Sequence, residues 1–263
     1  MNAAEAGLLF GAAILGGGLN AVAGGGGFLC LLPPMVFHQV PPLRANAMIA
    51  VSLWPGFLAS VLTASRPPVP HRRKVLWLLL ITAAGALTGA LLMLRTPPRV
   101  FMHLVPFLIL ATTLLFAGSG QVVARRRVAD SPPEAASMVP PLTAGMLLGQ
   151  LLIGIYGGYF GANLGLVLLA SLSLAGMRNR HAIDALRVQL ALCNGAVTAG
   201  VYMISGIVLW PQVLVMMAGT VAGGWAGSRY GRRLDGAWLH RAIVAAGLVI
   251  SAYLFVSVYL LSA

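Results

Sequence analysis

Two glycine-rich stretches have the residue types that could bind an anion. The first covers 16–27, with glycine at seven of its positions, and the second covers 156–165. Glycine costs about 1 kcal/mol relative to alanine inside a helix, so both stretches favour a break. A helix that restarts inside a membrane presents free backbone N–H groups and a partial positive charge. We therefore expect half-helices that begin near Gly26 and Leu164 to point these groups at one anion. Close packing of helices through small residues is the alternative.

Polar and aromatic side chains in and after these breaks complete the candidate site. Amide and hydroxyl groups donate hydrogen bonds to oxyanion oxygens, and aromatic rings can form the walls of a cavity. The expected substrate-binding residues are Asn20, Gly25, Gly26, Gly27, Asn46, Ser52, Trp54, Tyr156, Tyr159, Gly161, Asn163, Gln189, Asn194 and Arg187. Hydrogen bonds between packed helices and aromatic rings at the membrane interface are the competing interpretations.

Arg187 and Asp184 are the charged candidates. A buried arginine costs about 2.5–3.5 kcal/mol at the bilayer centre, so Arg187 needs a partner or a cavity. Asp184 lies three residues earlier, and the two side chains can simply neutralise each other near the membrane surface. In the functional interpretation, Arg187 draws the anion in from the cytoplasm and Asp184 carries a coupling proton.

The sequence has no recognisable metal or catalytic motif. The five histidines are dispersed, without the HxxxH or HExxH spacing of a metal site. No GxSxG motif or P-loop occurs, so we expect no cofactor and no enzymatic activity. Cys30 and Cys193 lie in apolar segments and are typical of small core residues.

The composition is that of a polytopic membrane protein. Of 263 residues, 59% are hydrophobic and 8% are charged, against about 25% charged in soluble domains. This excludes a cytosolic enzyme, a coiled coil and a disordered chain. The net charge of +12 is spread over short clusters between apolar runs. This pattern is typical of the basic residues that orient a protein in the membrane and not of nucleic-acid binding.

The expected partners are the lipid bilayer, a small anion and a second copy of the chain, as a homodimer.

Apolar runs predict the helices that position the site. A membrane-spanning helix needs about 20 residues. Six runs fit: Ala45–Ala64, Val75–Leu94, Val100–Ser119, Ala182–Ile204, Val213–Ser228 and Trp238–Leu261. Two longer runs, Ala4–Phe37 and Pro140–Gly176, contain the glycine breaks. Their halves, of about 12–17 residues, suit a re-entrant hairpin, although two full crossings remain an alternative.

The chain also repeats itself. At a shift of 138 residues the apolar runs superimpose, and Gly27, Gly85 and Gly89 fall on Gly165, Gly223 and Gly227. The predicted organisation is repeat 1 over 1–120, a cytoplasmic linker over 121–139 and repeat 2 over 140–263. The fold class is then all-α, with two repeats that each contain one broken segment and three transmembrane helices.

The positions of the basic residues predict the topology. If each broken segment returns to the side that it entered from, most of the 17 lysines and arginines lie on one side. Only Arg44, Arg95 and Arg99 lie on the other. The positive-inside rule then places both termini outside the cytoplasm. Three net crossings per repeat make the two halves inverted, which is a transporter architecture.

Several motifs resemble one known family. They are Gly24-Gly25-Gly26-Gly27-Phe28, Pro41-Pro42-Leu43-Arg44-Ala45-Asn46-Ala47, Leu53-Trp54-Pro55-Gly56, Tyr156-Gly157-Gly158-Tyr159-Phe160-Gly161-Ala162-Asn163-Leu164-Gly165 and Leu192-Cys193-Asn194. Together they resemble the TauE/SafE sulfite exporter family over nearly the whole chain. The resemblance implies transport of small sulfur-containing anions, such as sulfite and organosulfonates, across the bacterial inner membrane. The chain departs from the family pattern at Ile183-Asp184, where Ala-Asn is frequent.

These observations favour a secondary transporter that works by alternating access at a midplane site formed by both repeats. An anion channel and a non-transporting membrane scaffold subunit are the alternatives. An intramembrane enzyme would need a nucleophile–base pair, which the sequence does not offer at a recognisable spacing.

Overall fold

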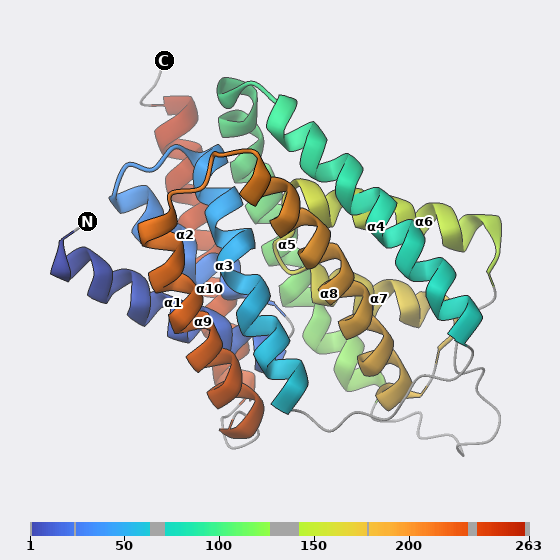
Figure 1. Cartoon of the computed structure of the whole chain (residues 1–263). Coiled ribbons are helices and arrows are strands. Elements are labelled where there is room, and N and C mark those ends of the chain that lie inside the picture. Colours follow the sequence, from blue (N-terminus) through green and yellow to red (C-terminus); the bar gives the residue numbers. More distant parts are fainter. Residues whose placement is uncertain are drawn as a thin grey trace.

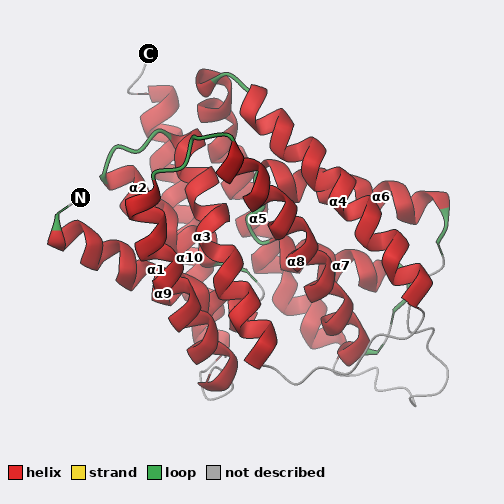
Figure 2. Ribbon diagram, viewed as in Figure 1, coloured by secondary structure: helices red, strands yellow, loops and turns green. Residues whose placement is uncertain are grey.

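The computed structural model describes residues 2–23, 25–63, 72–126, 142–177, 179–230 and 236–260. Within these residues every regular element is a helix (Figure 2), as the composition predicts. The helices are α1 (Ala3–Ala23), α2 (Gly27–Phe37), α3 (Pro42–Thr63), α4 (Arg72–Arg95), α5 (Pro98–Arg126), α6 (Ala144–Tyr159), α7 (Leu164–Leu174), α8 (Arg180–Ile204), α9 (Trp210–Tyr230) and α10 (Gly236–Phe255), which continues as a π-helix over Val256–Leu260.

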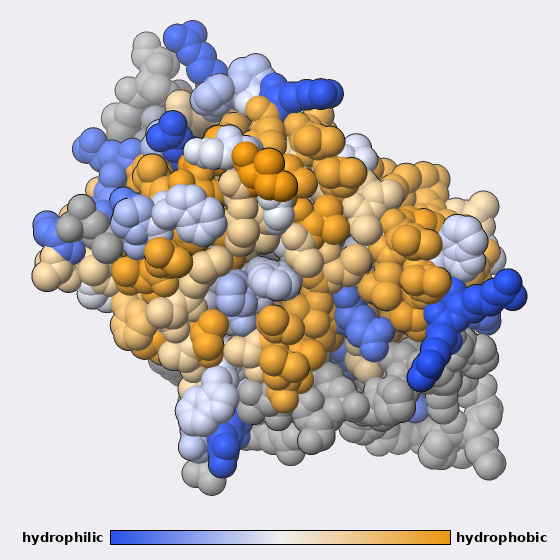
Figure 3. Space-filling model, viewed as in Figure 1, coloured by the Kyte–Doolittle hydropathy of each residue, from blue (hydrophilic) through white to orange (hydrophobic). Residues whose placement is uncertain are grey.

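The six predicted spans correspond to α3, α4, α5, α8, α9 and α10. By length and composition alone, three segments of the described residues are long and apolar enough to cross a membrane: Ala3–Val22, Pro42–Leu62 and Arg72–Arg95. Large apolar side chains such as Leu76, Trp77 and Leu80 are more than half exposed. Apolar side chains cover much of the surface in Figure 3, and the most hydrophilic groups lie mainly near its margins. A surface of this kind suits contact with lipid.

The breaks are shorter than the glycine pattern indicates. In the two glycine-rich stretches, the chain leaves helical geometry only in the short segments between α1 and α2 and between α6 and α7. Gly16, Gly17 and Gly18 are helical, as are Gly157 and Gly158. As a result α1 has 21 residues, more than the predicted half-helix, whereas α6 has 16 and α2 and α7 have 11 each.

These helical glycines allow close crossings between helices. A Cβ atom at Gly17 would overlap the backbone of Thr220 in α9, and one at Gly158 would overlap the backbone of Ala86 in α4. The packing interpretation is therefore correct for these glycines, because the partner backbones leave no space for a side chain.

Corresponding helices of the two halves begin 138 residues apart: Pro42 and Arg180, Arg72 and Trp210, Pro98 and Gly236. Helices of one half pack against helices of the other half. Helix α1 packs against α9, α6 packs against α4, and α3 packs against α8. In Figure 1, α3 descends from blue to cyan while its neighbour α8 ascends from gold to orange, so the two helices run in opposite directions.

Part of the predicted linker is helical. Helix α5 continues to Arg126 and so includes the first residues of the segment 121–139. The rest of the linker lies outside the described residues, as do five basic residues used for the topology prediction: Arg66, Arg127, Arg178, Arg232 and Arg233.

Candidate functional site

Left-handed backbone angles create the two breaks. Gly26 has φ +88° and Gly161 has φ +70°, which glycine adopts without the penalty of a side chain. Asn163 also lies in this region, with φ +56°, and asparagine is one of the few other residues that tolerate it. Each break therefore lets one helix end and the next begin in a new direction within a few residues.

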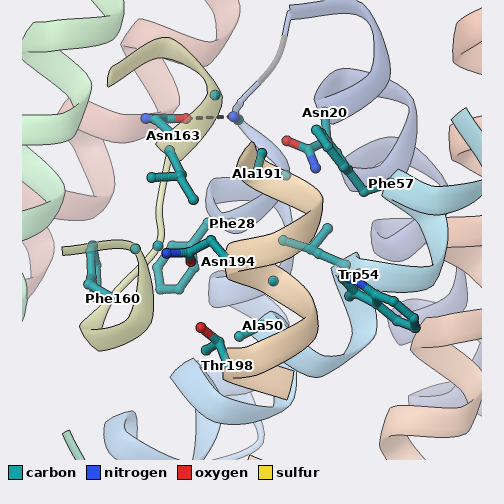
Figure 4. A pocket seen from close by; sticks show the side chains of 18 residues that line it. Asn20, Phe28, Ala50, Trp54, Phe57, Phe160, Asn163, Ala191, Asn194 and Thr198 are labelled. Atoms are coloured by element: carbon teal, nitrogen blue, oxygen red, sulfur yellow. Dashed lines mark hydrogen bonds between the residues drawn. The ribbon is translucent and has the colours of Figure 1, made fainter. Parts of the chain in front are cut away.

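Asn163 joins the two breaks. The backbone N–H of Gly26 donates to Asn163 Oδ1 at 2.6 Å, and Asn163 Nδ2 donates to the carbonyl of Thr112 in α5 at 3.3 Å. The first of these bonds is drawn in Figure 4. A Cβ atom at Gly25 would lie only 2.6 Å from Asn163 Oδ1. Gly25 thus belongs to the break because it leaves room for the asparagine that connects the two halves.

A cavity of about 100 Å³ lies between the two breaks and the central helices α3 and α8 (Figure 4). One small ion or a few water molecules fit in this volume. Its lining includes the predicted residues Asn20, Gly26, Gly27, Trp54, Gly161, Asn163 and Asn194, together with Phe28, Phe57, Phe160, Leu164 and Thr198. The structure therefore brings both half-helix starts and both central helices to one place.

The cavity has a buried end and a partly exposed end. Phe28 and Phe160 are buried, with ring centroids 4.8 Å apart, and Thr198 is 3% exposed. Trp54 and Phe57 are partly exposed. Phe57 lies toward the end of α3, the end that precedes the basic start of α4. Phe57, one of these two partly exposed lining residues, thus lies toward the side predicted to be cytoplasmic.

The first turn of α2 supplies backbone donors to this cavity. The N–H groups of Gly27, Phe28 and Leu29 have no acceptor within their own helix, as in any first turn. The first turn closes with the N–H of Cys30 donating to Gly26 O. Gly27 and Phe28 line the cavity, so the positive end of α2 lies at its wall.

Other predicted residues lie in helix contacts outside the cavity lining. Asn46 Nδ2 donates to Tyr159 O at 3.1 Å, and Tyr159 donates to Thr96 Oγ1 at 3.3 Å. The Tyr156 hydroxyl donates to Ala162 O, and Ser52 Oγ donates to Ile49 O. These bonds match the packing interpretation. Gln189 is half-buried and does not line the cavity.

Arg187 and Asp184 form an ion pair on α8. Arg187 Nε lies 2.9 Å from Asp184 Oδ1, and the aspartate side chain is 51% exposed. Neither residue lines the cavity. Arg187 precedes the lining residue Ala191 by one turn, so the two residues lie on the same face of α8, with Arg187 nearer the start of the helix. Its role in attracting the anion and the coupling role of Asp184 stay predictions.

Thr198 is a polar lining residue that the sequence did not predict. Helix hydroxyls of this chain usually donate back to their own helix, as Thr82 does to Leu78 O and Thr112 does to Ile109 O. The buried Thr198 Oγ1 has no hydrogen-bond partner. Its position one turn after Asn194, on the same face of α8, is the signal that could have identified it.

Charged side chains are absent from the cavity lining as described. Within the described residues, no group of three histidine, cysteine, aspartate or glutamate side chains is placed to hold a metal ion. What the lining offers is hydrogen-bond donors, a helix N-terminus and aromatic walls.

Comparison with known proteins gives a family match over residues 9–254, to the model described as sulfite exporter TauE/SafE. A "Probable membrane transporter protein ORF9" from Sinorhizobium sp is 31% identical over 223 residues, which are 84% of this chain and 81% of the relative. A "Probable membrane transporter protein" from Haemophilus influenzae is 28% identical over 80% of this chain and 79% of its own length. The "Probable membrane transporter protein YfcA" of Escherichia coli K12 is 26% identical over 94% and 88%, respectively. No solved structure matches the chain.

Proposed function

Because the chain belongs to the TauE/SafE sulfite exporter family, whose members are multi-pass membrane transporters, we propose that it moves a small sulfur-containing anion across the bacterial inner membrane. The substrate is sulfite or an organosulfonate. The single observation that carries this proposal is the cavity into which both half-helix starts and both central helices project. Sites built from broken helices near the midplane are typical of secondary transporters.

The proposed mechanism is alternating access. The two halves are inverted repeats, an arrangement supported by the 138-residue spacing of their helices and the opposite directions of α3 and α8. The Phe28–Phe160 pair covers the buried end of the cavity, while the other end is partly exposed. A rocking motion of one half against the other would exchange the open and closed ends.

Flux measurements in liposomes test the proposal directly. We expect saturable uptake of sulfite and methanesulfonate and little uptake of chloride, because the lining donors are arranged for oxygen acceptors. Repeating the assay with an imposed pH gradient tests for proton coupling. A Gly161→Leu variant, which cannot adopt φ +70° without strain, should insert normally and lose the flux.

Each alternative gives a different result in this assay. Flux that does not saturate and continues at high concentration would indicate a channel. Absence of flux for every anion, with correctly inserted protein, would favour a scaffold role. Full activity of the Gly161→Leu variant would contradict a substrate path through the second break.

The topology makes a separate prediction. In a variant without Cys30 and Cys193, a cysteine at Arg72 should react only with a reagent that reaches the cytoplasm. Cysteines at Arg99 and Asn2 should react with an impermeant reagent from outside, because α4 crosses the membrane between Arg72 and Arg95. Labelling of positions 2 and 72 from the same side would contradict the inverted arrangement.

A further inference from the structure

The cavity lining, as far as the structure describes it, contains no charged side chain, and this limits the charge of the substrate. Resting on the transport function above, we propose that the cavity accepts monoanions, hydrogen sulfite or a sulfonate, and rejects dianions such as sulfate and fully ionised sulfite. The α2 N-terminus and the Thr198 hydroxyl are the groups that hold the monoanion.

Removing a dianion from water costs far more free energy than removing a monoanion. No lysine, arginine or histidine lines the cavity as described, so no side chain in it offsets the charge of an anion. The free energy needed to remove an ion from water rises with the square of its charge. A dianion therefore loses about four times as much solvation as a monoanion of the same size, while the cavity offers both ions the same donors.

The donors in the cavity offset only part of one negative charge, which favours a monoanion over a dianion. A helix N-terminus is equivalent to about half a positive charge, and the first turn of α2 lies at the cavity wall through Gly27 and Phe28. Thr198 is an independent indication of a ligand, because the residue is 3% exposed and lines the cavity, and its hydroxyl has no hydrogen-bond partner. A buried hydroxyl without a hydrogen-bond partner destabilises the protein. A hydrogen bond from the hydroxyl to an oxygen of a bound anion would remove this cost.

Among the residues that the structure describes, no titratable side chain lines this cavity. On the helices that surround it, the described ionisable side chains are Glu5, Cys30, Arg44, Tyr156, Tyr159, Asp184, Arg187, Cys193 and Tyr202, none of which lines it. A pH dependence of sulfite transport near neutrality should therefore follow the protonation of the substrate. Sulfite gains a proton near neutral pH, whereas a sulfonate keeps one negative charge and sulfate keeps two.

The test compares three labelled anions in liposomes that have the same pH on both sides. Between one unit above and one unit below neutrality, we expect sulfite flux at a subsaturating concentration to rise severalfold on acidification. Methanesulfonate flux should stay constant, and sulfate flux should be at least about tenfold lower than methanesulfonate flux. Sulfate flux equal to that of methanesulfonate, or sulfite flux that falls on acidification, would overturn the inference and leave the transport function standing. Absence of flux for all three anions would overturn both.

A pair of matched variants tests the role of Thr198. Thr198→Val keeps the side-chain shape and removes the hydroxyl, so the KM for methanesulfonate should rise about tenfold, and Thr198→Ser should restore it. Thr113 is the control, because its hydroxyl is also buried without a partner but faces Gly247 outside the cavity. Thr113→Val should leave the KM unchanged. An unchanged KM in Thr198→Val would remove Thr198 from the site.

Discussion

Replacing Asn163 with glycine should reduce substrate flux at least about tenfold while the protein still inserts in the membrane. Glycine keeps the left-handed backbone that Asn163 adopts at φ +56°, so the variant removes the side chain without straining the chain. What disappears is the acceptor for the Gly26 N–H and the donor to Thr112 O. A buried N–H left without a partner costs about 1–3 kcal/mol. The start of α2 is then no longer held in place at the cavity wall. Initial flux rates and thermal melting of the purified protein measure the two effects.

A second asparagine provides the control for this variant. Asn179 caps α8 by accepting a hydrogen bond from the Ala182 N–H at 3.1 Å, and it lies outside the cavity lining. Asn179→Gly also removes a capping side chain and should cost only a few tenths of a kcal/mol. We expect near-normal flux from Asn179→Gly. If Asn163→Gly transports equally well, the connection between the two breaks has no role in positioning the site.

The positions of the breaks show how far the sequence could predict the fold. The glycine clusters predicted half-helices that begin near Gly26 and Leu164, and the structure has α2 beginning at Gly27 and α7 at Leu164. They did not reveal that Gly16 to Gly18 remain helical. Glycine has two uses here, a positive φ at a break and the close approach of a second helix. The second use depends on a partner, such as Thr220 for Gly17, that is about 200 residues away. One sequence does not contain that pairing.

The candidate site was predictable to a similar degree. Asn20, Asn163 and Asn194 were expected and line the cavity, because breaks and polar residues inside apolar helices can be recognised from residue type. Asn46 is also an asparagine in an apolar helix, but its side chain donates to Tyr159 O in α6, outside the cavity lining. Thr198 was missed because a threonine in a helix ordinarily bonds to its own backbone. The difference lies in which face of each helix points to the cavity, and this is decided by tertiary packing.

Replacing Gly223 with valine should prevent assembly of the fold. The ideal Cβ position at Gly223 overlaps the carbonyl oxygen of Ile14, where α9 crosses α1. Because this obstacle is backbone, a rotamer change cannot relieve it, and the two helices must separate. Overpacking ordinarily costs about 1–3 kcal/mol and more where the neighbours cannot move. We expect the melting temperature in detergent to fall by at least about 10 °C, or the protein to aggregate during size-exclusion chromatography.

The equivalent position in the other half should behave in the same way. Gly85 in α4 lies 138 residues before Gly223, and its Cβ would be 2.6 Å from Leu151 O in α6. Gly11 in α1 has nothing within 4 Å of its Cβ position, so Gly11→Ala should keep or slightly raise the stability. Equal losses from Gly223→Val and Gly85→Val, with Gly11→Ala unaffected, follow if α1 and α6 each pack into the opposite half. A stable Gly223→Val protein would mean that α1 does not cross α9 at Ile14. In that case the exchange of helices between the halves would no longer explain how both breaks come to face one cavity.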